Sequence, residues 1–467
     1  DFQTNSGTGS EYTSNSVFGR VIYSYADRYL FQANVRHDGS SRFAKGYRWG
    51  TFPSFSAGWV ASEEKFMKNL KWDWLSFLKL RGSWGMLGNE RIGSNYFPYI
   101  ALMSFGNSLF YMADGSVVSD KTARPAVLAV EDITWETTTS TDLGLDVNFL
   151  NNRLQFHFDY YWKETKDMLL NIEIPYFMGY NNPSTNAGKM STHGYDIEVA
   201  WNDQIGDFKY DINVNFSDFL SKIDYMNDGE QISGGKIKRA GVLFNEFYGY
   251  VCEGIYQTQE EVNNSARTST TVTVGDLKYR DISGPDGVPD GVISPEYDRV
   301  PLGNSLPRFQ YGGSLNASYK GIDFSLAFQG IGKQNSYLST SMVQPLRDNY
   351  GNVPAILEGK YWSPFNTTEE NLAAKYPRLS NVSKSNNYAT SSFWMFNGSY
   401  FRLKNITLGY TLPKSWTQKA GINRARFYVS GSDLFCLSNF PSGWDPEMGT
   451  SDYPITTSLV MGIQVNF

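Results

Sequence analysis

The chain has 467 residues, of which 16% are aromatic and 19% are charged, and its formal net charge at pH 7 is −6. This negative balance, without any clustered Lys/Arg face, excludes nucleic-acid binding. No apolar run approaches the roughly 18 to 20 residues of a membrane-spanning helix, so a membrane could be crossed only by strands.

Alternation of apolar and polar side chains recurs along the chain and predicts half-buried antiparallel strands. The clearest stretches are 143–149, 154–162, 208–216 and 322–328. We expect the apolar parity, which includes Phe158 and Val214, to face lipid. The polar parity, with His157 and Asn213, should then face a wet lumen.

Tight turns alternate with long polar excursions. The turns are predicted at 27–28, 151–152, 203–206 and 320–321, and the excursions at 88–133, 167–190, 225–306, 333–398 and 436–454. Outer-membrane barrels have short periplasmic turns and long extracellular loops. The predicted fold class is therefore all-β, a transmembrane antiparallel β-barrel to which this chain contributes about 13 strands. Because a closed single-chain barrel has an even number of strands, further strands are expected upstream.

Two short helices and the chain ends complete the predicted organisation. Residues 62–75 are expected to form an amphipathic helix with Ser62 as N-cap, and 364–376 a second helix inside an outer loop. Asp1 begins abruptly without Met, which indicates a piece of a longer protein. The last residues alternate up to Phe467, which suits the final strand of a barrel.

One acidic, glycine-bearing turn inside the 225–306 excursion is the only candidate metal site. Hard cations take six to eight oxygen ligands. We predict a structural Ca²⁺ (or Mg²⁺) held by Asp281, Ser283, Asp286, Asp290, the carbonyl of Val292, and Asp298. Pro285 breaks the spacing of an EF-hand loop, so a solvated turn without metal is the alternative.

No catalytic constellation is found, so the chain is not expected to be an enzyme and no catalytic cofactor is predicted. The three histidines read as ordinary wall residues. Cys252 and Cys436 lack metal or redox spacing, and a disulfide between them is left open. Aromatic residues in the outer loops are candidates for contact with a sugar ligand or a partner protein, or simply hold the loops together. They are Tyr96, Phe393, Trp394, Trp444 and Tyr453.

Several motifs spread over the chain resemble the SusC/RagA-type TonB-dependent transporters of the bacterial outer membrane. They are DGSSRF at 38–43, LKLRGSWG at 78–85, GDLKY at 275–279, DRVPLGN at 298–304 and FRLKNITLGY at 401–410. The chain departs from the family at Ser432-Asp433, where Gln-Asn is usual.

This resemblance implies a barrel of about 22 strands, of which the chain is the C-terminal part. It also implies an upstream plug domain, a SusD-like surface lipoprotein as lid, and energy supplied through TonB. Transporter–lipoprotein pairs could further associate as a dimer. The expected function is energised import of a large nutrient, most often an oligosaccharide and sometimes a peptide. The alternatives are a passive porin or adhesin-type barrel, and a secreted β-rich glycan-active protein.

Overall fold

The computed structural model describes residues 7, 9, 11–70, 72–92, 96–172, 174–227, 229–338, 340–347, 351–382, 384–449 and 452–467. The chain divides into two compact units. The first comprises Asp1–Ile197, Phe219–Gln231 and Arg239–Val242, and the second comprises Glu198–Asp218, Ile232–Lys238 and Leu243–Phe467. Two long strands, β9 (Ser184–Ile205) and β10 (Phe208–Met226), contribute residues to both units.

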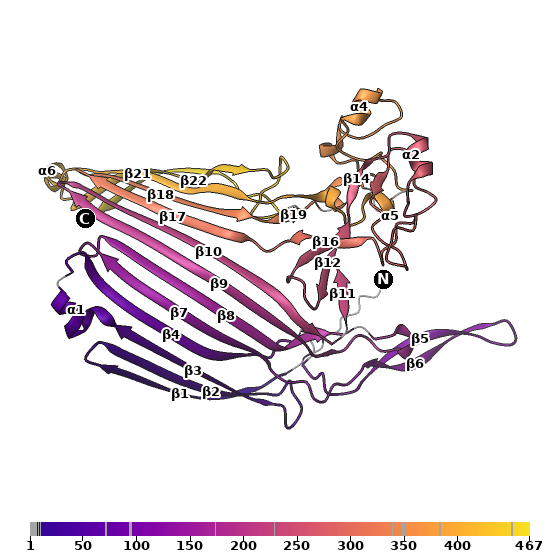
Figure 1. Cartoon of the computed structure of the whole chain (residues 1–467), viewed down its shortest axis with the longest axis horizontal. Helices are drawn as coiled ribbons and strands as arrows, with labels where there is room; N and C mark the ends of the chain where they lie inside the picture. Colours follow the sequence, from indigo (N-terminus) through magenta and orange to yellow (C-terminus); the bar gives the residue numbers. More distant parts are fainter. Residues whose placement is uncertain are drawn as a thin grey trace. The chain divides into compact units, whose positions relative to one another are not determined.

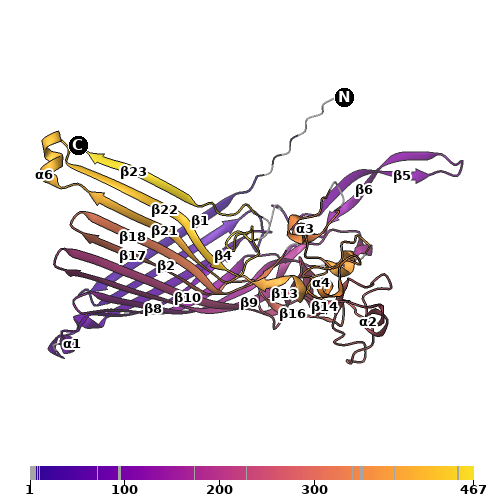
Figure 2. The same cartoon turned by 90° about the horizontal axis from the view of Figure 1, so that it is seen from above.

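Within the described residues, 13 strands form one sheet whose neighbours follow one another in chain order. Six of them belong to the first unit: β1 (Ser14–Tyr25), β2 (Tyr29–Ser40), β3 (Trp49–Val60), β4 (Leu75–Asn89), β7 (Glu136–Phe149) and β8 (Leu154–Asn171). Five belong to the second: β17 (Arg308–Tyr319), β18 (Ile322–Lys333), β21 (Tyr400–Thr411), β22 (Arg424–Ser438) and β23 (Ser458–Asn466). The strands of each unit lie side by side in Figure 1 and Figure 2. The predicted strand number and chain-order topology are thus confirmed.

The remaining elements lie in the connections. The strands are β5 (Leu102–Tyr111), β6 (Val117–Val127), β11 (Glu230–Ser233), β12 (Lys236–Arg239), β13 (Glu246–Tyr250), β14 (Cys252–Ile255), β15 (Leu277–Tyr279), β16 (Arg299–Asn304), β19 (Asn335–Tyr337) and β20 (Met395–Asn397). The helices are α1 (Lys65–Leu70), α2 (Gln259–Asn264), α3 (Thr340–Val343), α4 (Thr368–Leu372), α5 (Lys384–Asn387) and α6 (Lys414–Thr417). Short 3-10 turns occur at Ala61–Glu63, Tyr176–Met178, Ala355–Leu357, Ser392–Trp394 and Gln418–Ala420. No helix among these residues is long and apolar enough to cross a membrane.

The sheet has an apolar and a polar face, as the alternation predicts. On β7 and β8, Leu143 lies opposite Tyr160, and these side chains are 54% and 40% exposed. Three residues away along each strand, and so on the other face, His157 lies opposite Asp146, and Nδ1 of its ring is 3.0 Å from the carboxylate. Large apolar side chains that stand this open require an apolar surrounding.

The outer ends of the first-unit strands are closed by a small aromatic core. Phe43, the last residue of the DGSSRF motif, is fully buried and its ring lies 5.5 Å from that of Trp135. Trp135 also meets Phe52 edge-on at 5.4 Å. The Phe52 ring lies so close to Gly88 that a Cβ there would be 2.0 Å from it. A side chain at position 88 would therefore displace the Phe52 ring from this core.

In the second unit, the long connections fold around a core of their own. Its buried members are Tyr250, Leu277, Tyr279, Ile293, Leu338, Val343, Leu357 and Trp394. We call these residues the loop core. The GDLKY motif lies in it because Leu277 and Tyr279 are buried and Gly275 has φ +86, which favours glycine. Asp276 is fully buried and is bonded to Arg378 at 2.7 Å and to Asn387 at 2.9 Å.

Three local predictions need correction. The turn expected at 203–206 is only Gly206-Asp207, because β9 extends to Ile205. The helix expected at 62–75 is confined to α1, with residue 71 outside the described residues. Ser62 is not its N-cap, because a 3-10 turn takes up Ala61–Glu63 and buries the Ser62 hydroxyl without a partner.

The helix expected at 364–376 is likewise shorter. It is α4, opened by a capping box between Thr367 and Glu370. The chain leaves the helix after Leu372 because Tyr376 turns back, its carbonyl accepting the Trp362 N–H at 2.9 Å.

Candidate functional site

The polar face of the first unit carries a connected group of charges centred on Arg81 of β4. The guanidinium lies 2.6 Å from Asp159 on β8, 3.3 Å from Asp146 on β7 and 3.6 Å from Asp142, also on β7. Lys79 lies two residues before Arg81, on the same face, 3.8 Å from Asp146. The register places these side chains together, because Lys79 pairs with Asp146 and Gly144 pairs with both Arg81 and Asp159.

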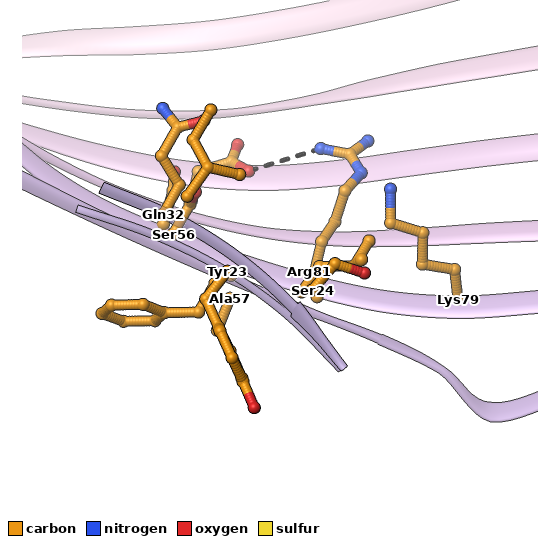
Figure 3. Close-up of a pocket in the computed structure, with 14 residues that line it drawn as sticks. Tyr23, Ser24, Gln32, Ser56, Ala57, Lys79 and Arg81 are labelled. Carbon is orange, nitrogen blue, oxygen red and sulfur yellow. Dashed lines mark ion pairs between the residues drawn. The ribbon is translucent and has the colours of Figure 1, made fainter. Parts of the chain in front are cut away.

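These charges remain in contact with water. The Arg81 side chain is 32% exposed, and the three carboxylates are between 12% and 26% exposed. A hollow of about 410 Å³ lies beside them, lined also by side chains of β1 to β3 such as Ser24, Gln32 and Ser56. Figure 3 shows Gln32, Lys79 and Arg81 extending from one side of the strands and Tyr23 from the other.

The arrangement suits reversible binding of polar groups. Arg81 supplies a planar donor group and the aspartates supply acceptors, so a polar surface brought against this face could exchange bonds with either. His157 joins the same group of charges, because Nδ1 of its ring contacts Asp146. We call the set Lys79, Arg81, Asp142, Asp146, His157 and Asp159 the wall network.

The long connection between β4 and β7 contains a hairpin that was not predicted from the sequence, where 88–133 was expected to be a polar excursion. Strands β5 and β6 form an antiparallel hairpin, and Figures 1 and 2 both show it projecting away from β4 and β7. One face of β5 carries Phe105, Leu109 and Tyr111, which are 81%, 75% and 81% exposed. Their period-2 spacing was visible in the sequence. An apolar stripe on a projecting hairpin is typical of a protein-binding surface.

The acidic turn of the second unit is held by its own backbone. Asp298 is fully buried and accepts N–H groups from Ile282 at 2.7 Å, Ser283 at 3.2 Å and Ser294 at 2.7 Å. Oδ2 of Asp281 accepts the Gly291 N–H at 2.7 Å.

The other predicted metal ligands diverge. Asp290 accepts the Val292 N–H at 2.9 Å, while the Asp286 side chain is exposed. Oδ1 of Asp281 is buried without a partner. Among the described residues, no three His, Cys, Asp or Glu side chains are gathered closely enough to hold a metal. The Ca²⁺ or Mg²⁺ site stays a prediction.

The five aromatic candidates occupy different environments. Trp394 is 2% exposed in the loop core, and Phe393 and Trp444 pack against that core. Tyr96 stacks on Tyr12 at 5.7 Å, with the Arg42 guanidinium 4.7 Å from its ring. Tyr453 is 79% exposed. Of the five, Tyr453 presents the most ring surface to a ligand.

The two cysteines are both free thiols. The disulfide that the sequence left open is therefore absent from the structure. Burial of Cys252 raises the pKa of its thiol to about 11, whereas Cys436 is exposed on β22.

Sequence reasoning also missed a second charge network, at the outer end of β21. The side chain of Arg402 is 3% exposed and lies 2.6 Å from both Asp445 and Glu447 and 3.6 Å from Asp433. Lys404 lies 2.8 Å from Asp433 and 3.3 Å from Glu447. Because Asp445 and Glu447 belong to the connection between β22 and β23, these bonds fasten that loop to the strand. We call the five residues the clasp network.

In the comparisons with known proteins, almost the whole chain is matched. The family model described as TonB dependent receptor-like, beta-barrel matches residues 1–430. TonB-dependent receptor P3 of Formosa agariphila is 31% identical over 97% of this chain and 45% of its own length. TonB-dependent receptor SusC of Bacteroides thetaiotaomicron is 30% identical over 97% of this chain and 43% of its own length.

A solved structure, that of the RagAB peptide transporter, matches 98% of this chain and 48% of its own chain at 25% identity, with a TM-score of 0.77. This chain thus spans about half the length of the curated relatives that it matches.

Proposed function

The chain belongs to the TonB dependent receptor-like β-barrel family, of SusC/RagA type, and from this we propose that it is the C-terminal part of a transporter that imports a large nutrient. Its place is the bacterial outer membrane, and the family consists of receptors and transporters rather than enzymes. In the proposal, upstream sequence supplies the remaining strands and a plug, and TonB supplies the energy.

The two-faced strands of the first unit carry this proposal. The apolar face, with Leu143 and Tyr160, stands against lipid, and the wall network stands on the opposite, lumenal face. A barrel of about 22 strands is too wide for its own side chains to fill, so a plug must close it. The wall network offers that plug charged bonds that remain accessible to water and can therefore be exchanged during transport.

We propose the β5–β6 hairpin as a contact for a SusD-like lipoprotein lid. Transporters of this type work with such a lipoprotein, and the stripe of Phe105, Leu109 and Tyr111 is too apolar to stay in water without a partner. Replacing Phe105 by Asp should abolish co-purification of the lipoprotein. The matched control is Ser108→Asp on the opposite face of β5, which should leave it intact.

The nutrient is proposed to be an oligosaccharide, with a peptide as the alternative. The exposed ring of Tyr453 suits the C–H face of a sugar, whereas the similar RagAB structure is that of a peptide transporter. Growth on oligosaccharides and on peptides as sole carbon source, with and without the transporter gene, separates the two.

Uptake in a strain without TonB tests the energised mechanism. We expect uptake of the large nutrient to stop there while the barrel still assembles. Unchanged uptake would refute the proposal and favour a passive porin. Failure of the protein to fractionate with the outer membrane would favour a secreted glycan-active protein.

The acidic turn remains our proposed Ca²⁺ site, with a structural role. Calcium should raise the protease resistance of 276–300, and Asp281→Asn should remove the effect because this carboxylate has a buried oxygen left without a partner. Equal resistance in calcium and in chelator would show that the backbone bonds alone hold the turn.

A further inference from the structure

The connection between β3 and β4 is fixed to the wall by one carboxylate. Glu64 is 9% exposed. Its Oε1 accepts the Tyr29 hydroxyl at 2.5 Å and the Trp59 indole N–H at 3.2 Å, and its Oε2 accepts Arg28 at 2.8 Å. Glu64 directly precedes α1, which is too short to be stable alone. The helix is therefore held in place by this clamp at the periplasmic ends of β1 to β3.

The segment that follows the clamp exposes an unusual amount of apolar surface. Phe66 is 55% exposed, Leu70 48%, Trp72 44% and Trp74 49%. Phe66 and Leu70 lie one turn apart on the same side of α1. We call residues 65–70 together with 72–74 the basal segment.

The basal segment continues the apolar face of the wall. The Phe66 ring lies 6.5 Å from that of Trp59, at the end of β3. Trp72 stacks on Trp74 at 5.3 Å, and Trp74 stacks on Phe149, at the end of β7, at 5.8 Å. Phe149 has the same parity as the exposed Leu143, so these contacts place the aromatic rings on the lipid side of the wall and away from the lumen.

The polar side of the helix is basic and stays in water. Lys65 and Lys68 are exposed, and Lys68 makes only a surface ion pair with Glu63 at 2.6 Å. Tryptophan, Phe and Leu on one side with Lys on the other is the composition of helices that lie in a membrane interface. The cationic side chains suit anionic headgroups, and their aliphatic stems can reach around the apolar side.

We propose that the basal segment is an interfacial anchor that lies in the phospholipid headgroup layer of the inner leaflet of the outer membrane. Phe66, Leu70 and the two tryptophans enter the boundary of the acyl chains, while Lys65 meets the headgroups. The Glu64 clamp sets the depth and direction of the segment. The segment thereby fixes the height of the wall in the bilayer, independently of what is imported.

Spin labels on two positions of α1 test this in the full-length transporter, reconstituted in phosphatidylethanolamine–phosphatidylglycerol vesicles with Cys252, Cys436 and every other native cysteine replaced by Ser. A label at Phe66→Cys should collide several-fold more often with oxygen, which concentrates in lipid, than with a water-soluble nickel complex. The matched control, Lys68→Cys on the opposite side of the same helix, should show the reverse preference.

Two outcomes would overturn the proposal. Equal access of the nickel complex to both labels would leave the segment in water. Protection of the Phe66 label from both reagents would place it against protein. Glu64→Ala should shift the Phe66 label several-fold toward the nickel complex, while heat-modifiable migration of the folded barrel is kept. Uptake is not the readout, so loss of transport and loss of anchoring are distinguished.

Discussion

Arg81 and Arg402 each bring one guanidinium within 4 Å of three carboxylates, in different units and with different exposure. The Arg81 side chain is 32% exposed, whereas that of Arg402 is 3% exposed. The wall network joins residues of three neighbouring strands that the sheet already holds together. The clasp network joins β21 and β22 to the loop that connects β22 with β23.

The contrast shows that the ion pairs of a charge network do not by themselves indicate its role. Where water reaches the charges, as at Arg81, each bond is worth little and can be exchanged for a bond to another surface. Where water is excluded, as at Arg402, breaking a pair leaves buried charges uncompensated. The wall network therefore suits function, and the clasp network suits local stability.

Removal of Arg402 should have the largest effect. Arg402→Leu leaves Asp445 buried and Glu447 half-buried without their closest cationic partner, at a cost of about 3 to 5 kcal/mol. We expect a lower urea midpoint for unfolding, measured by heat-modifiable migration, and proteolysis within 439–449. The control is Arg424→Leu, an exposed arginine on β22, which should change little.

Removal of Arg81 should affect transport more than folding. Arg81→Gln should change the free energy of unfolding by about 1 kcal/mol or less, because the pairs are solvated. Passive leakage of the assembled transporter should increase if the plug uses this face. A loss of stability equal to that of Arg402→Leu would show that the two networks are equivalent and end the comparison.

The two free cysteines report where damage from such variants spreads. With a thiol pKa of about 11, Cys252 carries about 100-fold less thiolate at pH 8 than a thiol of pKa 9. We expect maleimide to label Cys436 readily. The labelling rate of Cys252 should rise about tenfold for each pH unit up to 11. In Arg402→Leu, continued protection of Cys252 would show that the loop core is intact. Rapid labelling at pH 8 would mean that the damage is global.

Protonation of Glu64 should have the smallest effect of these changes. It extends the comparison of the two charge networks to a single carboxylate. The bonds from Tyr29 and Trp59 lower the pKa of Glu64, so its ionised form favours the clamped state. The stabilisation is present above the ordinary Glu pKa of about 4 and is lost as the pH falls through the lowered value. A fluorophore at Phe66→Cys should report release only under acid, and Glu64→Gln should abolish that transition.

The sequence predicted what depends on periodicity and missed what depends on distant partners. Alternation placed Asp146 and His157 on one face, and the register brings them within 3.0 Å. Arg402 could not be matched with Asp445, because the two are 43 residues apart and no pattern links a strand to a loop. Ser62 failed as a cap because Ala61–Glu63 form a 3-10 turn, after which Glu64 is bonded to Tyr29 and Trp59 across the turn.

The stripe on the β5–β6 hairpin is a different kind of omission. Phe105, Leu109 and Tyr111 already alternate in the sequence, but the surrounding polar residues led to the reading of a featureless excursion. Where alternation of apolar and polar residues was considered, it correctly predicted a strand. It could not tell whether the apolar side meets lipid, a core or a partner protein.

The buried Asp276 has a consequence for how this protein is made. Its long-range partners Arg378 and Asn387 follow it by 102 and 111 residues, so these two contacts form only after that much more chain has been delivered. Contacts of such long range close slowly, because the entropy of a long loop must be lost first. During that interval Leu277 and Tyr279 are exposed next to an unpaired strand edge, which is the condition under which chains aggregate. Secretion of this chain should therefore depend on a periplasmic chaperone that covers the region around Asp276 until Asn387 arrives.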